Sequence, residues 1–181
     1  MKTILTVLLT SVAFGSVGLA ADPPKVGDVA KDFKLVALDG STTQLTKLTK
    51  QGPVALIVLR GYPGYQCPIC TTQFAEFRAK AEGFRKLGAN VVFVYPGPAD
   101  KLKDHASAFV KGKDYPEHFQ FVLDPDYALT SAYGLRWDAR GETAYPSTFV
   151  IDADNRIRFA AISKGHGGRT KAADVLKAIP Q

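Results

Sequence analysis

The two residues most capable of chemistry are Cys67 and Cys70, the only cysteines among the 181 residues. They follow an apolar run at residues 54–59 and precede a segment, residues 68–87, in which apolar side chains recur at steps of three and four. That spacing is typical of an amphipathic helix. The cysteines therefore lie where a buried strand turns into a helix. Pro68 suits the first helical position, which predicts Cys67 as the N-cap and Cys70 as the third helical residue.

A helix N-terminus favours a thiolate on these cysteines. Its unpaired N–H groups and partial positive charge stabilise an anion, and Cys-x-x-Cys thiols at such positions have lowered pKa values. We expect Cys67 to be the more exposed and more acidic sulfur, and Cys70, one turn later on the same face, to close a disulfide with it. Attack by one sulfur and resolution by the other is two-electron dithiol chemistry that needs no cofactor beyond this redox-active disulfide.

Two structural roles for the cysteine pair have less support. A zinc site needs two further ligands, usually a second pair, and the three histidines, His105, His118 and His166, are isolated in the sequence. A purely structural disulfide would close a very short loop and would stabilise the fold little. The sequence therefore favours a redox pair and no metal.

Residues 1–20 are typical of a cleavable signal peptide. Lys2 supplies a positive start, residues 3–19 are mostly apolar, and Gly18-Leu19-Ala20 is similar to a small-x-small cleavage site. The run is short and interrupted by polar residues, which favours cleavage over retention as a membrane anchor. We expect residues 21–181 to form a periplasmic or secreted domain with no stable membrane association. Paired cysteines in such compartments are normally oxidised unless a reductant is delivered.

Length and composition indicate one globular domain. The hydrophobic content is 46%, the charged content is 22% and the formal net charge is +6, values ordinary for a protein with its own core. The basic residues are scattered, without interleaved aromatic residues, so a nucleic-acid partner has little support.

Strands and helices alternate along the rest of the chain. The pattern predicts a hairpin at 33–45, strands at 54–60, 90–95 and 119–123, helices at 68–87, 100–110 and 170–179, a helical turn at 125–133, a polar loop at 136–144 and a second hairpin at 147–160. This order predicts parallel strand pairs in a central sheet covered on both faces, with an antiparallel part from the last hairpin. Ligand chemistry in such sheets lies at the carboxyl ends of strands, where the cysteines are expected.

With Cys67-Pro68-Ile69-Cys70 at a strand-to-helix turn, the chain resembles the thioredoxin-fold superfamily, and more closely its AhpC/TSA, or peroxiredoxin-like, branch. Val26-Gly27-Asp28 with Asp32-Phe33-x-Leu35 is similar to the opening of that branch, and residues 145–152 are similar to the strand that faces its active site. The resemblance covers nearly the whole mature chain. It implies a thioredoxin-like α/β fold, with a central mixed sheet flanked by helices and an N-terminal β-hairpin extension.

The resemblance leaves two chemistries open. Peroxiredoxins carry Pro-x-x-x-Thr/Ser-x-x-Cys, and Pro63 and Cys70 fit this pattern with Cys67 in place of the hydroxyl residue. By that alignment Cys70 would attack peroxide. An arginine on the facing strand supports the reactive cysteine in that family, whereas Pro146 stands at the matching place here. Thioredoxins have a cis-proline at that place, and a cis X–Pro bond is uncommon enough to indicate a purpose.

Other residues are candidates for supporting the cysteines. Arg60, Arg136 and Arg140 could supply the positive charge that the facing strand lacks, although Arg60 also suits an exposed strand end. Tyr62 and Tyr65 could line the entrance to the sulfurs.

The sequence predicts an extracytoplasmic thiol–disulfide oxidoreductase, a thiol-dependent antioxidant protein that cycles between the Cys67–Cys70 dithiol and disulfide. The Cys67 thiolate would attack a substrate disulfide and Cys70 would resolve it, with Arg60, Pro63, Tyr65 and Pro146 supporting catalysis or substrate binding. The alternative is a thiol peroxidase that reduces hydroperoxides through Cys70. Both functions need an external thiol reductant. The sequence leaves the oligomeric state open.

A non-enzymatic alternative is copper delivery. Proteins of the same fold that deliver copper use two cysteines and a distant histidine, and thiolates with an imidazole suit copper. Here Cys67, Cys70 and His166 would be the ligands, although the two-residue spacing of the cysteines is shorter than the usual three.

Overall fold

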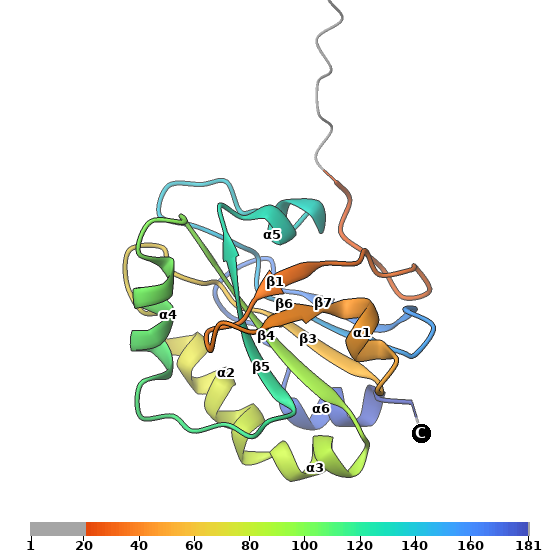
Figure 1. Cartoon of the computed structure of the whole chain (residues 1–181). Coiled ribbons are helices and arrows are strands. Elements are labelled where there is room, and N and C mark those ends of the chain that lie inside the picture. The colour runs from red at the N-terminus through yellow and green to blue at the C-terminus, as the bar shows by residue number, and fades with distance from the viewer. Residues whose placement is uncertain (1–20, 181) are drawn as a thin grey trace, which may run out of the picture.

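The computed structural model describes residues 21–180, whose centre is a five-stranded mixed sheet in the order β5-β4-β3-β6-β7 (Figure 1). The central strand β3 (Val54–Val58) pairs in parallel with β4 (Asn90–Gly97), which pairs in parallel with β5 (Phe119–Pro125). On its other side β3 pairs antiparallel with β6 (Ser147–Ile151), and β6 pairs antiparallel with β7 (Ile157–Ile162). The parallel and antiparallel halves agree with the sequence prediction. The signal peptide predicted at residues 1–20 lies outside the described residues.

A separate two-stranded hairpin forms the N-terminal extension. β1 (Lys34–Val36) and β2 (Thr42–Gln44) pair antiparallel. In the turn between them, the Ser41 N–H donates a hydrogen bond of 2.8 Å to the Asp39 carboxylate, and Gly40 has a φ of +90°. This region of φ favours glycine, so the Asp-Gly-Ser signal marks a real turn.

Helices cover both faces of the sheet. Successive apolar side chains of β3 point to opposite faces, so each face needs a cover. Ala55 and Ile57 face one core, which α2 (Pro68–Ala79), α3 (Ala81–Lys86), α4 (Leu102–Val110) and α6 (Ala172–Ala178) complete. Leu56 and Val58 face the other core, which receives α1 (Leu45–Thr49) and α5 (Ala128–Ala132). Figure 1 shows α2, α3 and α6 together below the sheet as drawn.

The core under α2 is built largely from aromatic rings. Phe74 meets Phe93 edge to face at a centroid distance of 4.8 Å, and Phe77 stacks on Phe84 at 5.5 Å. All four side chains are fully buried. Aromatic rings of this size contribute much of the hydrophobic burial of a domain, so this face holds α2, and with it the cysteines, against the sheet.

The helix predicted at residues 68–87 is two helices, which corrects the sequence prediction. The break lies at Lys80, whose φ of −106° and ψ of 10° end α2 and begin α3. The change of direction brings α3 against α6, where a Cβ on Gly83 would lie 3.1 Å from the Leu176 Cδ1 atom. The apolar periodicity continues through the break, because Phe77 and Phe84 contact the same core. Within residues 21–180, no helix has both the length and the apolar character that a membrane span requires.

Candidate active site

Sheet topology brings three loops to the carboxyl end of β3. Val58, the last residue of β3, pairs with Ser147, the first residue of β6, and Ser147 pairs with Ile162, the last residue of β7. The loop after β3, the loop before β6 and the loop after β7 therefore meet at one edge of the sheet. The first loop leads into Cys67, the second contains Glu142 and the third contains His166 and Arg169.

The cysteines begin α2 as the sequence predicts. Cys67 is the N-cap and Pro68 is the first helical residue, and the Cys67 Sγ accepts a hydrogen bond of 3.3 Å from the Cys70 backbone N–H. Cys67 is the more exposed of the two sulfurs, as expected, but both are buried: the exposed fraction is 3% for Cys67 and 0% for Cys70. Both sulfurs pack into the core under α2. They are present as free thiols.

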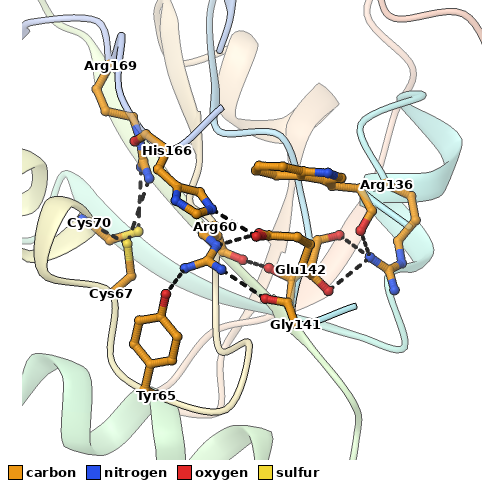
Figure 2. Close-up of polar contacts among 11 residues, drawn as sticks. Arg60, Tyr65, Cys67, Cys70, Arg136, Gly141, Glu142, His166 and Arg169 are labelled. Atoms are coloured by element: carbon orange, nitrogen blue, oxygen red, sulfur yellow. Dashed lines mark hydrogen bonds and ion pairs between the residues drawn. The ribbon is translucent and has the colours of Figure 1, made fainter. Parts of the chain in front are cut away.

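Arg169 is the arginine that contacts the sulfurs (Figure 2). Its Nη1 lies 3.5 Å from the Cys70 Sγ and its Nη2 lies 3.7 Å from the Cys67 Sγ. Nη1 also donates to the Gln73 side-chain oxygen at 3.3 Å. One guanidinium thus reaches both sulfurs. Arg169 is not among the arginines that the sequence predicts for this role.

The contacts around the sulfurs give the two thiols different pKa values. The Cys70 S–H donates a hydrogen bond to the Cys67 sulfur. This bond, the Cys70 N–H and the Arg169 charge together outweigh the effect of burial and lower the pKa of Cys67 to about 5. The same bond, together with burial, raises the pKa of Cys70. At neutral pH the pair therefore holds one thiolate on Cys67 and one neutral thiol on Cys70, and the thiolate is the reactive form.

Arg60 is buried beside the site rather than exposed at a strand end. Its exposed fraction is 4%, and its Nε binds the Glu142 carboxylate at 2.7 Å. Nη1 donates to the Tyr65 hydroxyl at 2.5 Å and Nη2 to the Gly141 carbonyl at 2.9 Å (Figure 2). Arg60 therefore connects the loop before the cysteines to the loop before β6. The Tyr65 side chain is half exposed.

Both carboxylate oxygens of Glu142 have a side-chain nitrogen beside them. One oxygen binds Arg60, and the other lies 2.8 Å from the His166 Nε2. Burial by itself raises the pKa of this carboxyl, but the hydrogen bonds from Arg60 and His166 outweigh burial and hold the Glu142 pKa below its usual value. Glu142 is therefore an ionised bridge between Arg60 and His166.

The copper site considered from the sequence has no support in this geometry. The His166 Nε2 faces Glu142, and the sulfurs already have the Arg169 guanidinium beside them. Among residues 21–180, no cluster of three or more His, Cys, Asp or Glu side chains could hold a metal ion.

Pro146 and Pro63 lie in two of the loops that form the site. Pro146 is buried directly before β6, and its carbonyl accepts a hydrogen bond of 2.8 Å from the Ser163 N–H. Its peptide bond is trans, because residues 21–180 contain no cis peptide bond, so the expected cis bond is wrong. A trans bond is the preferred form, and proline fits the extended backbone of a strand start. Pro63 lines a cavity of about 370 Å³ together with Tyr62 and Glu142.

The other two candidate arginines, Arg136 and Arg140, have different surroundings. The Arg136 Nη1 binds the Trp137 and Thr143 carbonyls at 2.5 Å each, and its guanidinium lies 4.0 Å from the centre of the Tyr127 ring. It therefore shapes the loop before β6. Arg140 is exposed.

Comparison with known proteins identifies similar sequences. The model of the AhpC/TSA family matches residues 26–160. The chloroplastic peroxiredoxin Q of Triticum aestivum is 30% identical over 144 residues, covering 80% of this chain and 62% of that protein. Peroxiredoxin Bcp of Escherichia coli is 28% identical over 142 residues, covering 75% of this chain and 84% of that protein.

Comparison with solved structures shows that peroxiredoxins share this fold. Peroxidoxin BcpB from Mycobacterium tuberculosis aligns with a TM-score of 0.66 at 26% identity, covering 85% of this chain and 95% of that one. A yeast mitochondrial 1-Cys peroxiredoxin also aligns with a TM-score of 0.66, at 17% identity, covering 84% of this chain and 73% of that one. The second likeness concerns the fold alone.

Proposed function

Because the chain belongs to the AhpC/TSA family, we propose that it is a thiol peroxidase of the peroxiredoxin kind, which reduces hydroperoxides with Cys67 and Cys70. The observation that carries the proposal is a sulfur pair in which one thiol is acidic, the other lies one helical turn away, and an arginine contacts both. The relatives are peroxiredoxins by name. A thiol peroxidase acting through Cys70 is the alternative that the sequence offers, and peroxide reduction has better support than disulfide exchange.

Burial of the sulfurs favours a small oxidant. Cys67 is 3% exposed and Cys70 is fully buried. A protein disulfide must place one of its own sulfurs in line with the attacking thiolate, which requires an accessible sulfur. A hydroperoxide needs to bring only one oxygen atom to Cys67.

Each step balances in atoms and electrons. The Cys67 thiolate attacks one peroxide oxygen, the O–O bond breaks, and the departing alkoxide or hydroxide takes a proton to become an alcohol or water. Cys67 is then a sulfenic acid. The Cys70 thiol attacks the Cys67 sulfur, water leaves and the Cys67–Cys70 disulfide forms, so the two thiols have supplied the two electrons that reduce the peroxide. Two equivalents of an external thiol restore the dithiol.

Arg169 supports the first step in two ways. Its guanidinium contacts both sulfurs and so stabilises the thiolate on Cys67. Negative charge develops on the leaving oxygen during the attack, and a preorganised cation close to the reacting sulfur lowers the barrier to such a step.

We assign the first attack to Cys67, although the family pattern places it at Cys70. Cys67 stands where peroxiredoxins have Thr or Ser, so the chain has a sulfur at both positions. The N-cap position, the hydrogen bonds from Cys70 and the charge of Arg169 all favour the thiolate on Cys67. Cys70, fully buried and neutral, is the resolving thiol.

The matched variants Cys67→Ser and Cys70→Ser test both the function and the assignment. Each reduced variant is mixed with hydrogen peroxide in the presence of a sulfenic-acid trap, and the trapped residue is identified by mass spectrometry. We expect Cys70→Ser to oxidise rapidly and to carry the trap on Cys67, and Cys67→Ser to react as slowly as free cysteine. Rapid trapping on Cys70 in Cys67→Ser would move the primary role to Cys70. Slow reaction of both variants and of the unmodified protein would reject the peroxidase.

Disulfide exchange is the second candidate, and the N-cap thiolate of Cys67 in a Cys-x-x-Cys pair favours it. In this reaction Cys67 forms a mixed disulfide that Cys70 resolves. The Cys70→Ser variant would then accumulate mixed disulfides with a model disulfide substrate, at a rate well above that of a free thiol at the same pH.

We further propose that the protein acts outside the cytoplasm, on the support of the signal-like residues 1–20. Mass spectrometry of the N-terminus of the protein recovered from fractionated cells tests this. A mature chain that begins near residue 21 in an extracytoplasmic fraction is expected, and a full-length chain in the cytoplasm would contradict it.

A further inference from the structure

Arg169 lies in a segment that has little intrinsic preference for one conformation. The loop between β7 and α6 contains Gly165, Gly167 and Gly168, and Gly168 has a φ of +69°. Glycine loses more backbone freedom on ordering than any other residue. A guanidinium held 3.5 and 3.7 Å from two sulfurs therefore needs contacts that fix this loop.

His166 provides a contact between this loop and the rest of the site. Its backbone carbonyl accepts a hydrogen bond of 3.1 Å from the Arg169 Nε, and its Nε2 lies 2.8 Å from the Glu142 Oε1. The imidazole also lies 5.2 Å from the Trp137 ring. His166 thus holds Arg169 through its backbone while its side chain binds a different loop (Figure 2).

Glu142 can anchor His166 because Glu142 is itself fixed. Its side chain is 11% exposed, and its Oε2 lies 2.7 Å from the Nε of the buried Arg60. Arg60 is held by the Gly141 carbonyl, and its own carbonyl accepts a hydrogen bond from the Thr143 hydroxyl. The chain of contacts therefore runs from the end of β3 through Arg60, Glu142 and His166 to Arg169 and the sulfurs.

We propose that Glu142 and His166 are positioning residues that hold the Arg169 guanidinium at the two cysteine sulfurs. The inference deepens the proposed function and rests on it for its catalytic meaning. His166, isolated in the sequence, is then neither a metal ligand nor a surface residue without a role. Breaking its contact with Glu142 releases the loop and reduces the time that Arg169 spends at the sulfurs. Cys67 then loses part of the charge that stabilises its thiolate.

The test is the pH dependence of Cys67 alkylation by iodoacetamide, with the Cys67 adduct quantified by mass spectrometry. In the His166→Ala variant we expect the alkylation midpoint to rise by about half a pH unit, roughly a threefold change in the protonation constant. His166→Gln can still donate a hydrogen bond to Glu142 and should restore most of the original midpoint. His118→Ala is the matched control, because His118 binds the Ala81 carbonyl at 3.1 Å in a different part of the fold.

A double-mutant cycle shows whether His166 acts through Arg169. In an Arg169→Met background, His166→Ala should cause no further shift, because residues that act through one contact are not additive. Glu142→Gln should shift the midpoint in the same direction, but it leaves the buried Arg60 without its ion pair, so its folding must be verified by circular dichroism. The exposed His166 side chain avoids that problem.

Three outcomes would overturn the inference: an unchanged midpoint in His166→Ala, a full shift of that variant in the Arg169→Met background, or an unchanged midpoint in Arg169→Met. Alkylation involves no peroxide. If the protein proved to react slowly with peroxide, the peroxidase would fail while this result could still be interpreted.

Discussion

The two sides of the cysteine pair are built in opposite ways. Toward the sheet, the sulfurs join a core of aromatic rings in which Phe74, Phe77 and Phe93 are fully buried. Toward the loops, the guanidinium of Arg169 contacts both sulfurs, and His166 connects Arg169 to Glu142 and Arg60. The first side is formed by neighbouring turns of α2 and adjacent strands. The second is formed by three loops that are far apart in the sequence.

The aromatic side fixes the position of the cysteines, and the loop side sets the reactivity of the Cys67 sulfur. Aromatic burial fixes where α2 begins, and its contribution depends on the apolar area removed from water rather than on pH. The loop side contributes charges and hydrogen bonds that act on one atom, the Cys67 sulfur, and that change its protonation. Variants of the core should therefore change the stability of the fold, whereas variants of the loops should change the acidity of Cys67.

The largest expected change in stability comes from the core variant Phe93→Ala. The Phe93 ring contacts Phe74, Phe77 and Phe121, and truncating a buried phenylalanine costs about 3–5 kcal/mol of the free energy of unfolding. Urea denaturation of the reduced protein measures this loss. The alkylation midpoint of Cys67 in the folded variant should stay unchanged. A large shift of that midpoint would show that the two sides are not separate.

The second expected change is in the Arg169→Met variant. Loss of the guanidinium from the sulfurs should raise the alkylation midpoint of Cys67 by about one pH unit, a tenfold change in the protonation constant, with a smaller loss of stability than in Phe93→Ala. Arg78→Met is the matched control on α2, because the Arg78 guanidinium binds the Asp114 carbonyl. Equal midpoints in the two arginine variants would contradict a role for Arg169.

A third prediction concerns how the stability of the reduced protein depends on pH. The pKa of Cys67 is about 5 when folded and has an ordinary value of 9.0. Because the folded pKa is lower, the stabilisation from this thiolate is complete above about pH 9 and is lost as the pH falls toward 5. The raised pKa of Cys70 acts in the opposite sense, reducing stability above the ordinary thiol pKa.

Urea denaturation under reducing conditions, from pH 5 to 9, measures this effect as the difference between the unmodified protein and Cys67→Ser. That difference should grow in favour of the unmodified protein as the pH rises. A difference that is constant over this range would mean that the thiolate is not on Cys67.

The smallest expected change is in Glu82→Gln, which removes a carboxylate from an exposed ion pair with Arg85. Exposed pairs contribute little, because water and salt screen them. The variant should match the unmodified protein in both urea denaturation and the alkylation midpoint. It serves as the exposed counterpart of Glu142→Gln, and a similar midpoint shift in both would indicate a general charge effect.

Local patterns were sufficient to predict most of the fold. The apolar run of β3, Pro68 at the first helical position and the Asp39-Gly40-Ser41 turn each depend on neighbouring residues, and the structure confirms all three. The break at Lys80 was not predictable, because the apolar spacing is the same for one helix as for two. Gly83 in α3 lies close to Leu176 in α6, a contact between segments far apart in the sequence that the apolar spacing does not encode.

The charged part of the site was predicted less well, because it too depends on contacts between segments far apart in the sequence. From the sequence, a cation is expected near the cysteines or on the facing strand, which makes Arg60, Arg136 and Arg140 the candidates. Arg169 is 99 residues after Cys70 and reaches it only because β7 ends at the same edge of the sheet as β3. A single arginine beside three glycines before the last helix was the available signal. The structure was required to connect it to the sulfurs.

The rate at which hydrogen peroxide oxidises the reduced protein decides whether this protein is a peroxidase. Stopped-flow mixing with excess peroxide near pH 7 would follow the fluorescence of Trp137, the only tryptophan, while quenched samples are counted for free thiols. If the protein is a thiol peroxidase, both thiols are lost and one peroxide is consumed per protein, at a rate far above that of free cysteine at the same pH. Oxidation no faster than that of free cysteine would contradict a peroxidase and leave disulfide exchange as the function to pursue.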